Sequence, residues 1–279
     1  MPRRNSRDPE SDPAAAFGDV LRRLREAANI TTQGAAGKRQ RYSNQTISRW
    51  ETGASVPDER QVNDLLDEYG VTGLLRDIVL GSWRLARKAK GPITESAAKY
   101  FTSEALALFI RIWAQVQVPG LLQAEEYARA MHDLAGSDPS ATEERVRIRL
   151  GRQSVLDRPD PPEVIAVLDE AVLYRLIGSP QTMVAQVDKL LEASQRPNVT
   201  IQVARGTGTY WGLSGAFEIA SGGEIPDTVV ILAFEDQTSD EPALARKALI
   251  VFEKLRNDGL NVRDSRAALM EAREHWESQ

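Results

Sequence analysis

The side chains of this sequence that could do the most specific chemistry lie in residues 42–53. Asn44 and Gln45 carry amides that can pair with the adenine edge in the major groove of DNA, and the Arg49 guanidinium can pair with the guanine edge. One short helix can present such closely spaced residues to a single groove. The segment therefore predicts a base-reading helix.

The neighbouring residues predict where this helix begins, ends and packs. Ser43 is a good N-cap, because its hydroxyl can accept a hydrogen bond from an amide of the first turn. Gly53 can adopt the left-handed conformation that ends a helix. Ile47 and Trp50 are three positions apart, so they share a face and are expected to pack inward. The outward positions are then Asn44, Gln45, Ser48 and Arg49.

The charge around this segment differs from that of the whole chain. The 279 residues have a formal net charge of −5 and a pI of about 5.3. Residues 51–71, however, hold six acids and one base, Arg60, whereas residues 22–50 hold one acid, Glu26, and seven bases. The seven are Arg22, Arg23, Arg25, Lys38, Arg39, Arg41 and Arg49. A basic segment in an acidic chain favours a local face for an anionic partner.

The rest of the sequence shows no pattern for catalysis or metal binding. There is no cysteine, and the two histidines, His132 and His275, are far apart. Asp169 and Glu170 are adjacent, which suits the start of a helix better than an acid–base pair. Residues 212–216 lack the final glycine of the G-x-S-x-G nucleophile motif. We therefore expect no catalytic residue, no metal and no cofactor, and the enzyme hypothesis is the weakest.

Two further features allow a structural or a functional interpretation. Residues 118–123, Val-Pro-Gly-Leu-Leu-Gln, predict a turn that feeds a helix, with a functional loop as the alternative. Four aromatic residues could line an apolar ligand pocket, although core packing is the commoner explanation. They are Trp113, Tyr210, Trp211 and Phe217.

The order of patterns along the chain predicts two domains of different class. Residues 1–13 are expected to form a disordered arm, residues 14–83 an all-α helix-turn-helix domain of about five helices, and residues 84–94 a basic linker that contains Gly-Pro. Residues 95–279 are expected to form an α+β domain with a small mixed or antiparallel sheet. The start has no apolar secretory segment and no stretch suits a membrane span, so a cytoplasmic protein is expected.

Within the second domain, apolar periodicity and β-branched runs predict the individual elements. The expected helices cover residues 95–116, 123–135, 141–156, 180–195, 241–257 and 262–277. The expected strands are Val164–Leu168, Val199–Val203, Ala216–Ile219 and Val229–Phe234.

The first domain resembles the phage-repressor (Xre) class of helix-turn-helix proteins. Residues 46–53, Thr-Ile-Ser-Arg-Trp-Glu-Thr-Gly, look like the end of that family's recognition helix, and residues 57–71 look like its closing helix. The resemblance implies that Glu51 pairs internally with Arg25, which gives Arg25 a structural role. The second helix, Thr32–Arg41, departs from the pattern with Gly34 and Gly37. The DNA-binding residues implied are Gln33, Ser43, Asn44, Gln45, Thr46, Ser48 and Arg49, with Gln33, Thr46 and Ser48 near phosphates.

Short strings in the second domain are similar to an actinobacterial family of Xre-type regulators that is WhiJ-like and antitoxin-like. The strings lie at residues 118–123, 126–130, 149–153, 167–171, 196–203 and 215–217. The resemblance implies a transcriptional regulator controlled through this domain by a small partner protein encoded nearby. The alternative is a one-component regulator that senses a small molecule. Because one recognition helix reads few base pairs, a homodimer on double-stranded DNA is expected, with half-sites about 34 Å apart.

Overall fold

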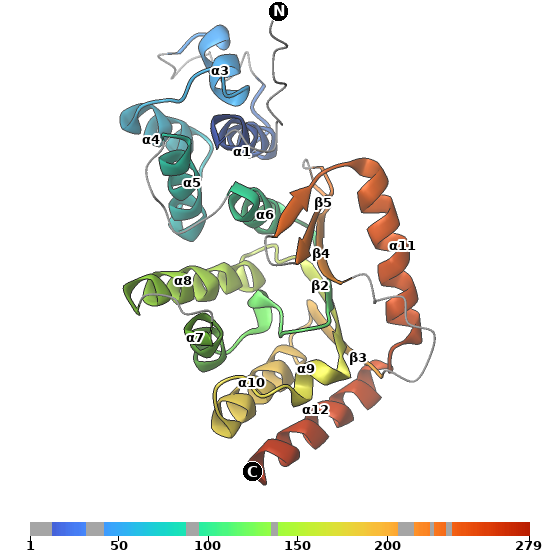
Figure 1. Cartoon of the computed structure of the whole chain (residues 1–279). Coiled ribbons are helices and arrows are strands. Elements are labelled where there is room, and N and C mark those ends of the chain that lie inside the picture. Colours follow the sequence, from blue (N-terminus) through green and yellow to red (C-terminus); the bar gives the residue numbers. More distant parts are fainter. Residues whose placement is uncertain are drawn as a thin grey trace, which may run out of the picture. The chain divides into compact units, whose positions relative to one another are not determined.

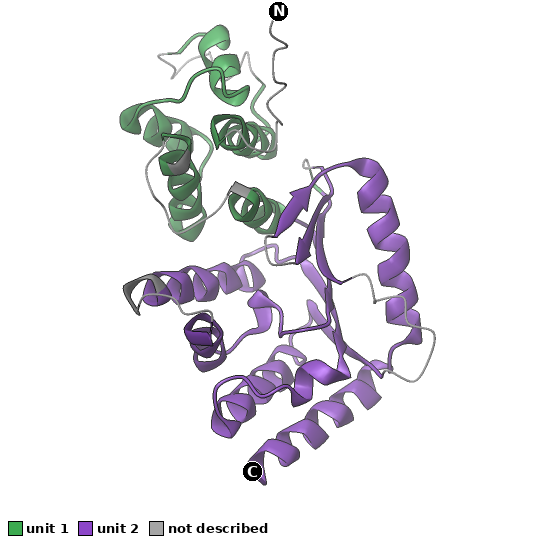
Figure 2. Cartoon of the chain, in the orientation of Figure 1, with its two compact units in different colours: residues 1–106, 223–225 green, residues 107–222, 226–279 purple. Residues whose placement is uncertain are grey.

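The computed structural model describes residues 13–31, 42–87, 95–134, 139–205, 215–223, 226–232 and 236–279. The chain divides into two compact units (Figure 2). Unit 1 comprises residues 1–106 with 223–225, and unit 2 comprises residues 107–222 with 226–279. In the described ranges, no helix is both long and apolar enough to cross a membrane.

All the regular elements in the described residues of unit 1 are helices (Figure 1). Amphipathic spacing forms most of the helices, and caps delimit several of them: Asp58 and Gln61, for instance, exchange hydrogen bonds in a capping box at the start of α4. The helices are α1 (Pro13–Ala27), α3 (Asn44–Glu51), α4 (Glu59–Glu68), α5 (Gly73–Ala86) and α6 (Glu95–Leu106). The expected second helix, Thr32–Arg41, lies outside the described residues, as does the expected arm up to residue 12.

One apolar core holds unit 1 together. Its buried side chains come from α1, α3, α4 and α5, and include Phe17, Leu21, Ile47, Trp50 and Leu66. Helix α6 packs against α1 and α5, so the first unit continues beyond residues 84–94, where the sequence predicts a linker. Residues 84–86 belong to α5.

Unit 2 is built on a six-stranded mixed sheet, which confirms the expected α+β class. The strand order is β3-β2-β1-β4-β5-β6. Strand β2 pairs in parallel with both β1 and β3. The pairs β1–β4, β4–β5 and β5–β6 are antiparallel. The strands are β1 (Phe109–Ala114), β2 (Glu163–Asp169), β3 (Val199–Ala204), β4 (Ala216–Ser221), β5 (Thr228–Leu232) and β6 (Gln237–Ser239).

Helices cover both faces of this sheet (Figure 1). Helix α11 (Pro242–Asp258) packs Phe252 and Leu255 on one face, against Trp113 and Phe217 of the strands. These two aromatic residues are therefore core, while Tyr210 and Trp211 lie outside the described residues. The other face carries α7 (Glu125–Leu134), α8 (Pro139–Arg152), α9 (Glu170–Tyr174) and α10 (Pro180–Ala193), and α12 (Val262–Glu277) contacts α10 and β3.

The expected helix over residues 95–116 is wrong in its second half. Helix α6 ends at Leu106, and residues 109–114 form β1, which lies between β2 and β4 in the middle of the sheet. Ile110 and Ile112 face one side of this strand and Trp113 the other, and all three are fully buried. A strand buried on both faces has a nearly continuous apolar sequence, which resembles that of a buried helix.

Candidate nucleic-acid interface

Helix α3 begins at the cap that the sequence predicts. The Ser43 hydroxyl accepts a hydrogen bond from the Thr46 amide at 3.2 Å, and the two hydroxyl oxygens are 2.9 Å apart. At the other end, the Thr52 hydroxyl donates to the Ser48 carbonyl, and Gly53 adopts a φ of +72°. The helix is therefore delimited by local hydrogen bonds and by one left-handed residue.

The two faces of α3 separate polar from apolar side chains. Ile47 and Trp50 are only 1% and 4% exposed and lie in the core of unit 1. The predicted base-contacting and phosphate-contacting residues are on the surface: Ser43, Asn44, Gln45, Ser48 and Arg49 are exposed and Thr46 is half-buried. Gln33, the remaining member of the predicted set, lies outside the described residues. One short helix and its N-cap residue thus present two amides, two hydroxyls and a guanidinium to the solvent.

Tyr42 holds this helix in place and was not predicted from the sequence. Its ring packs edge-on against Trp50, with 4.9 Å between the ring centroids, and its hydroxyl donates to Asp64 on α4 at 2.9 Å. An apolar residue directly before an N-cap is the sequence signature of a hydrophobic staple, which fixes the entry angle of a helix. That signal could have identified Tyr42.

The predicted pair between Arg25 and Glu51 is confirmed. Arg25 Nε donates to Glu51 Oε1 at 2.5 Å and Nη2 to Oε2 at 2.9 Å, while Nη1 donates to the Ile30 carbonyl at 2.8 Å. The hydrogen bond to Glu51 raises the pKa of Arg25 above its ordinary value. The two side chains are only 8% and 9% exposed. This bidentate pair joins the end of α1 to the end of α3.

The basic face of unit 1 is smaller than the sequence count indicates. Arg23 is 1% exposed; its Nε donates to Asp19 at 2.7 Å and its Nη1 donates to Ser103 of α6 at 3.0 Å. Arg22 also forms an ion pair with Asp19. Arg23 therefore belongs with Arg25 to the scaffold, and the residues at 38, 39 and 41 lie outside the described ranges.

Two glycines allow α1 to approach the end of α3 closely. A Cβ at Gly18 would lie 2.5 Å from the Trp50 carbonyl oxygen, and one at Gly53 would lie 2.5 Å from the Ala15 amide nitrogen. Real Cβ atoms do not approach backbone atoms that closely, so a larger residue at either position would separate the two helices. The orientation of α3 depends on this contact.

Two protein families match the chain. A helix-turn-helix domain family matches residues 16–78, and a domain of unknown function, DUF5753, matches residues 97–271. The second match covers more than half of the 279 residues. The chain belongs to the DUF5753 family. No curated protein and no solved structure matches it. The helix-turn-helix domain supports a DNA-binding regulator of transcription.

In the DUF5753 domain, the turn at residues 118–124 is held by buried glutamine side chains. Gln123 Nε2 donates to the Val118 carbonyl at 2.6 Å. Gln186 Nε2 donates to the Leu122 carbonyl at 2.8 Å, and its Oε1 accepts from the Ala124 amide at 2.9 Å. These contacts support the structural interpretation of this turn.

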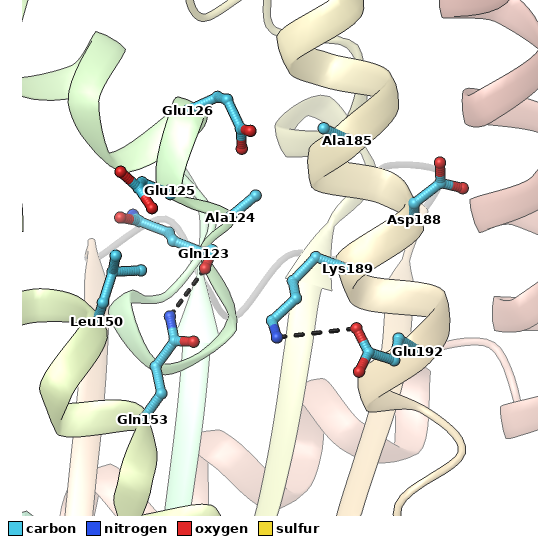
Figure 3. A pocket seen from close by; sticks show the side chains of 10 residues that line it. All are labelled: Gln123, Ala124, Glu125, Glu126, Leu150, Gln153, Ala185, Asp188, Lys189 and Glu192. Carbon is cyan, nitrogen blue, oxygen red and sulfur yellow. Dashed lines mark hydrogen bonds and ion pairs between the residues drawn. The ribbon is translucent and has the colours of Figure 1, made fainter.

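A hollow of about 510 Å³ lies beside this turn, between α7 and α10 (Figure 3). Glu125, Glu126, Asp188 and Glu192 contribute carboxylates to its lining, and Lys189 extends toward it from α10. Three of the four carboxylates have ion-pair partners: Glu125 with Arg129, Asp188 with Arg273, and Glu192 with Lys189. The remaining charge of the lining is negative, so its electrostatics favour a cation. No group of three or more potential metal ligands occurs in the described ranges.

His132 on α7 is expected to make the stability of the DUF5753 domain depend on pH. Burial, with Arg149 and Arg145 nearby, lowers the pKa of His132 to about 4. An unfolded histidine titrates near 6.5. Between about pH 6.5 and pH 4 the unfolded chain therefore binds a proton that the folded chain does not. The free energy of unfolding is expected to decrease as the pH is lowered through this window. The melting temperature of the native chain should fall relative to that of His132→Gln as the pH is lowered across this window, and parallel curves would contradict the prediction.

Proposed function

We propose that this DUF5753 protein is a sequence-specific transcriptional regulator of the Xre type, in which α3 enters the major groove. The exposed polar face of α3, opposite the buried Ile47 and Trp50, is the observation that carries the proposal. Asn44 and Gln45 in its first turn would pair with adenine edges, and Arg49 with a guanine edge. Ser43, Thr46, Ser48 and Gln33 would contact phosphates or neighbouring bases and orient the helix.

We further propose that the protein acts as a homodimer on two half-sites and is controlled through its DUF5753 domain. A single helix reads too few base pairs to select one site in a genome, whereas two helices about 34 Å apart can read successive major grooves. The resemblance to the actinobacterial WhiJ-like regulators favours antitoxin-like control by a small protein encoded nearby. The second domain has its own sheet and core, so it can carry such a site without altering α3 directly.

The decisive experiment selects bound fragments from random and genomic DNA with the purified full-length chain. The selection is carried out with and without the small protein encoded beside it. Paired half-sites with a fixed spacing, and a change in enrichment when the small protein is added, are expected. Binding without sequence preference would contradict the proposed sequence-specific recognition of DNA. Enrichment that is the same with and without the small protein would contradict the proposed control by that protein.

Arg49→Ala is expected to relax base preference at one position of the selected site. The loss should be about 1–3 kcal/mol of specific binding, because a bidentate contact to guanine disappears. Arg60→Ala, at an exposed position on α4, removes the same charge elsewhere in unit 1 and serves as the matched control. Fluorescence anisotropy on specific and random duplexes measures both. If the ratio of affinities for specific and random duplexes is unchanged in Arg49→Ala, Arg49 does not contact a base.

A second candidate for the control mechanism is direct sensing of a small molecule. The hollow between α7 and α10 favours it, since its volume of about 510 Å³ is in the range of ligand sites and its lining is acidic. A thermal-shift screen with cationic metabolites separates the two mechanisms. A stabilised DUF5753 domain with released DNA supports sensing, whereas a shift seen only with the neighbouring small protein supports partner control.

A further inference from the structure

Helices α7 and α8 pack against each other, and both are anchored at the end that adjoins the turn preceding α7 (Figure 1). The Val118 amide donates to the hydroxyl of Tyr127, a fully buried residue near the start of α7, at 3.2 Å. In the last turn of α8, Arg149 Nη1 donates to Gln123 Oε1 at 3.0 Å. Gln153, directly after α8, donates to the Gln123 carbonyl at 2.8 Å. The start of α7 and the end of α8 are thus fixed to the same turn.

The opposite ends of the two helices, residues 129–134 and 142–146, are held less firmly, and we call them the tip of the helix pair. An ion pair between Arg129 and Glu143 joins the helices here, but the two side chains are 35% and 67% exposed, and surface pairs of this kind contribute little to stability. Of these residues, all of which the structure describes, Val146 alone is a buried apolar residue. Segments with few buried apolar contacts are the ones that open locally in a folded protein.

Two buried polar atoms at the tip have no hydrogen-bond partner among the residues that the structure describes. They are Nε2 of His132 on α7 and Oγ1 of Thr142 on α8. Thr142 shares a helix face with Arg145 and Arg149, whose charges act on His132, so this face of α8 is turned towards α7. An unsatisfied buried atom disfavours the packed state, because the same atom forms hydrogen bonds with water when the helices separate.

The charges around His132 favour its neutral form in the packed tip. Burial, followed by Arg149 and Arg145 on α8, lowers the pKa of His132 to about 4, and only the neighbouring Asp133 on α7 opposes this shift. Helix α10 also packs on α7. The charged residues of α10 line the hollow beside the first turn of α7, away from the tip: Asp188, Lys189 and Glu192.

We propose that the tip of α7 and α8 is an acid-sensitive element that opens while the sheet of the DUF5753 domain stays folded. In the opened tip, water satisfies His132 Nε2 and Thr142 Oγ1, and the imidazole can bind a proton. The protonated imidazole is disfavoured in the packed tip, because burial and two guanidinium groups oppose its charge. Acid therefore shifts the equilibrium towards the opened tip. This inference does not depend on the proposed recognition of DNA.

The size of the effect follows from the two pKa values of His132. The pKa is about 4 in the packed tip and returns to the ordinary value near 6.5 in the opened tip. Between about pH 7 and pH 5 the opening equilibrium constant is therefore expected to rise about twentyfold. The direction is fixed by the depressed pKa, since the opened tip binds the extra proton throughout this window.

Native-state hydrogen exchange of the full-length chain tests the proposal. After correction for the intrinsic exchange rates, amide protection at the tip should fall about twentyfold from pH 7 to pH 5. It should depend little on low concentrations of urea, because a local opening exposes little surface. Amides of β1 and β2 should exchange more slowly and depend steeply on urea. Tip amides that exchange only together with these strands, or protection that does not fall with pH, would overturn the proposal.

Three substitutions separate the two groups at the tip. H132Q removes the titrating imidazole and should reduce the pH dependence of tip protection to less than about threefold, since histidine is the side chain that ordinarily titrates in this range. H275Q replaces the other of the two histidines, at an exposed position on α12, and should leave the twentyfold change intact. T142V keeps the shape of the side chain without its unsatisfied hydroxyl, so it should raise tip protection about fivefold or more at each pH. An H132Q chain with the full pH dependence, or a T142V chain with unchanged protection, would show that these groups do not control the opening.

Discussion

Replacing Glu51 with glutamine is expected to destabilise unit 1 by about 3–5 kcal/mol, because it removes the charge of the shielded carboxylate that pairs bidentately with Arg25 and leaves only the more exposed Glu26 beside the guanidinium. The Arg25 and Glu51 side chains are only 8% and 9% exposed, so water cannot replace the lost carboxylate. For a domain of about 100 residues this loss corresponds to a fall of more than about 10 °C in melting temperature. Urea unfolding followed by circular dichroism measures it.

Glu26→Gln is the matched control for this change. Glu26 also faces Arg25, at 3.7 Å from Nη2, but its side chain is 40% exposed. A solvent-exposed pair of this kind contributes at most about 1 kcal/mol. Equal losses in the two variants would show that burial of the Arg25–Glu51 pair does not dominate the stability of the helix-turn-helix unit. Specific DNA binding should fall in Glu51→Gln in parallel with the folded fraction, since α3 keeps its outer face.

Replacing Gly53 with alanine is expected to destabilise unit 1 by about 2–4 kcal/mol. The backbone at this position has a φ of +72°, which is strained for alanine, and the new Cβ would lie 2.5 Å from the Ala15 amide nitrogen. Because both clashing groups are backbone, α1 and the end of α3 would have to separate. Specific DNA affinity should therefore fall by more than the loss of folded protein explains.

Gly70→Ala separates the two causes of this loss. Gly70 has a φ of +69°, but nothing lies within 4 Å of a Cβ placed there. The control therefore reports the backbone strain alone, about 1 kcal/mol, and the difference between the variants reports the close approach of α1 and α3. Identical unfolding free energies for Gly53→Ala and Gly70→Ala would exclude a role for helix proximity.

The sequence predicted helix α3 well because its determinants are local. The Ser43 cap, the left-handed Gly53 and the pair Ile47 and Trp50 act within a few residues of one another, and the structure contains each of them as expected. The Arg25–Glu51 pair was expected from a family resemblance, since nothing in the local sequence connects two residues 26 positions apart.

Other features of unit 1 could not be predicted, because they depend on contacts between segments that are distant in the sequence. Arg23 counts as surface charge in the sequence, yet it is buried because Asp19 and Ser103 supply partners around it. The role of Gly18 likewise appears only when α1 and α3 are packed together, and the hydrogen bond from Tyr42 to Asp64 appears only when α4 packs beside α3. A single sequence does not show which charged residue will find buried partners.

The sequence by itself determined the caps, the polar and apolar faces of α3, the α+β class of the second domain and most of its helices, because these follow from spacing within each element. Only the tertiary structure decided that residues 109–114 form a central strand, since β2 and β4 supply its hydrogen bonds from outside the segment. The tertiary structure also decided that α6 belongs to unit 1, and it decided which face of α12 is exposed. Packing partners, rather than local propensity, select the buried side of a helix.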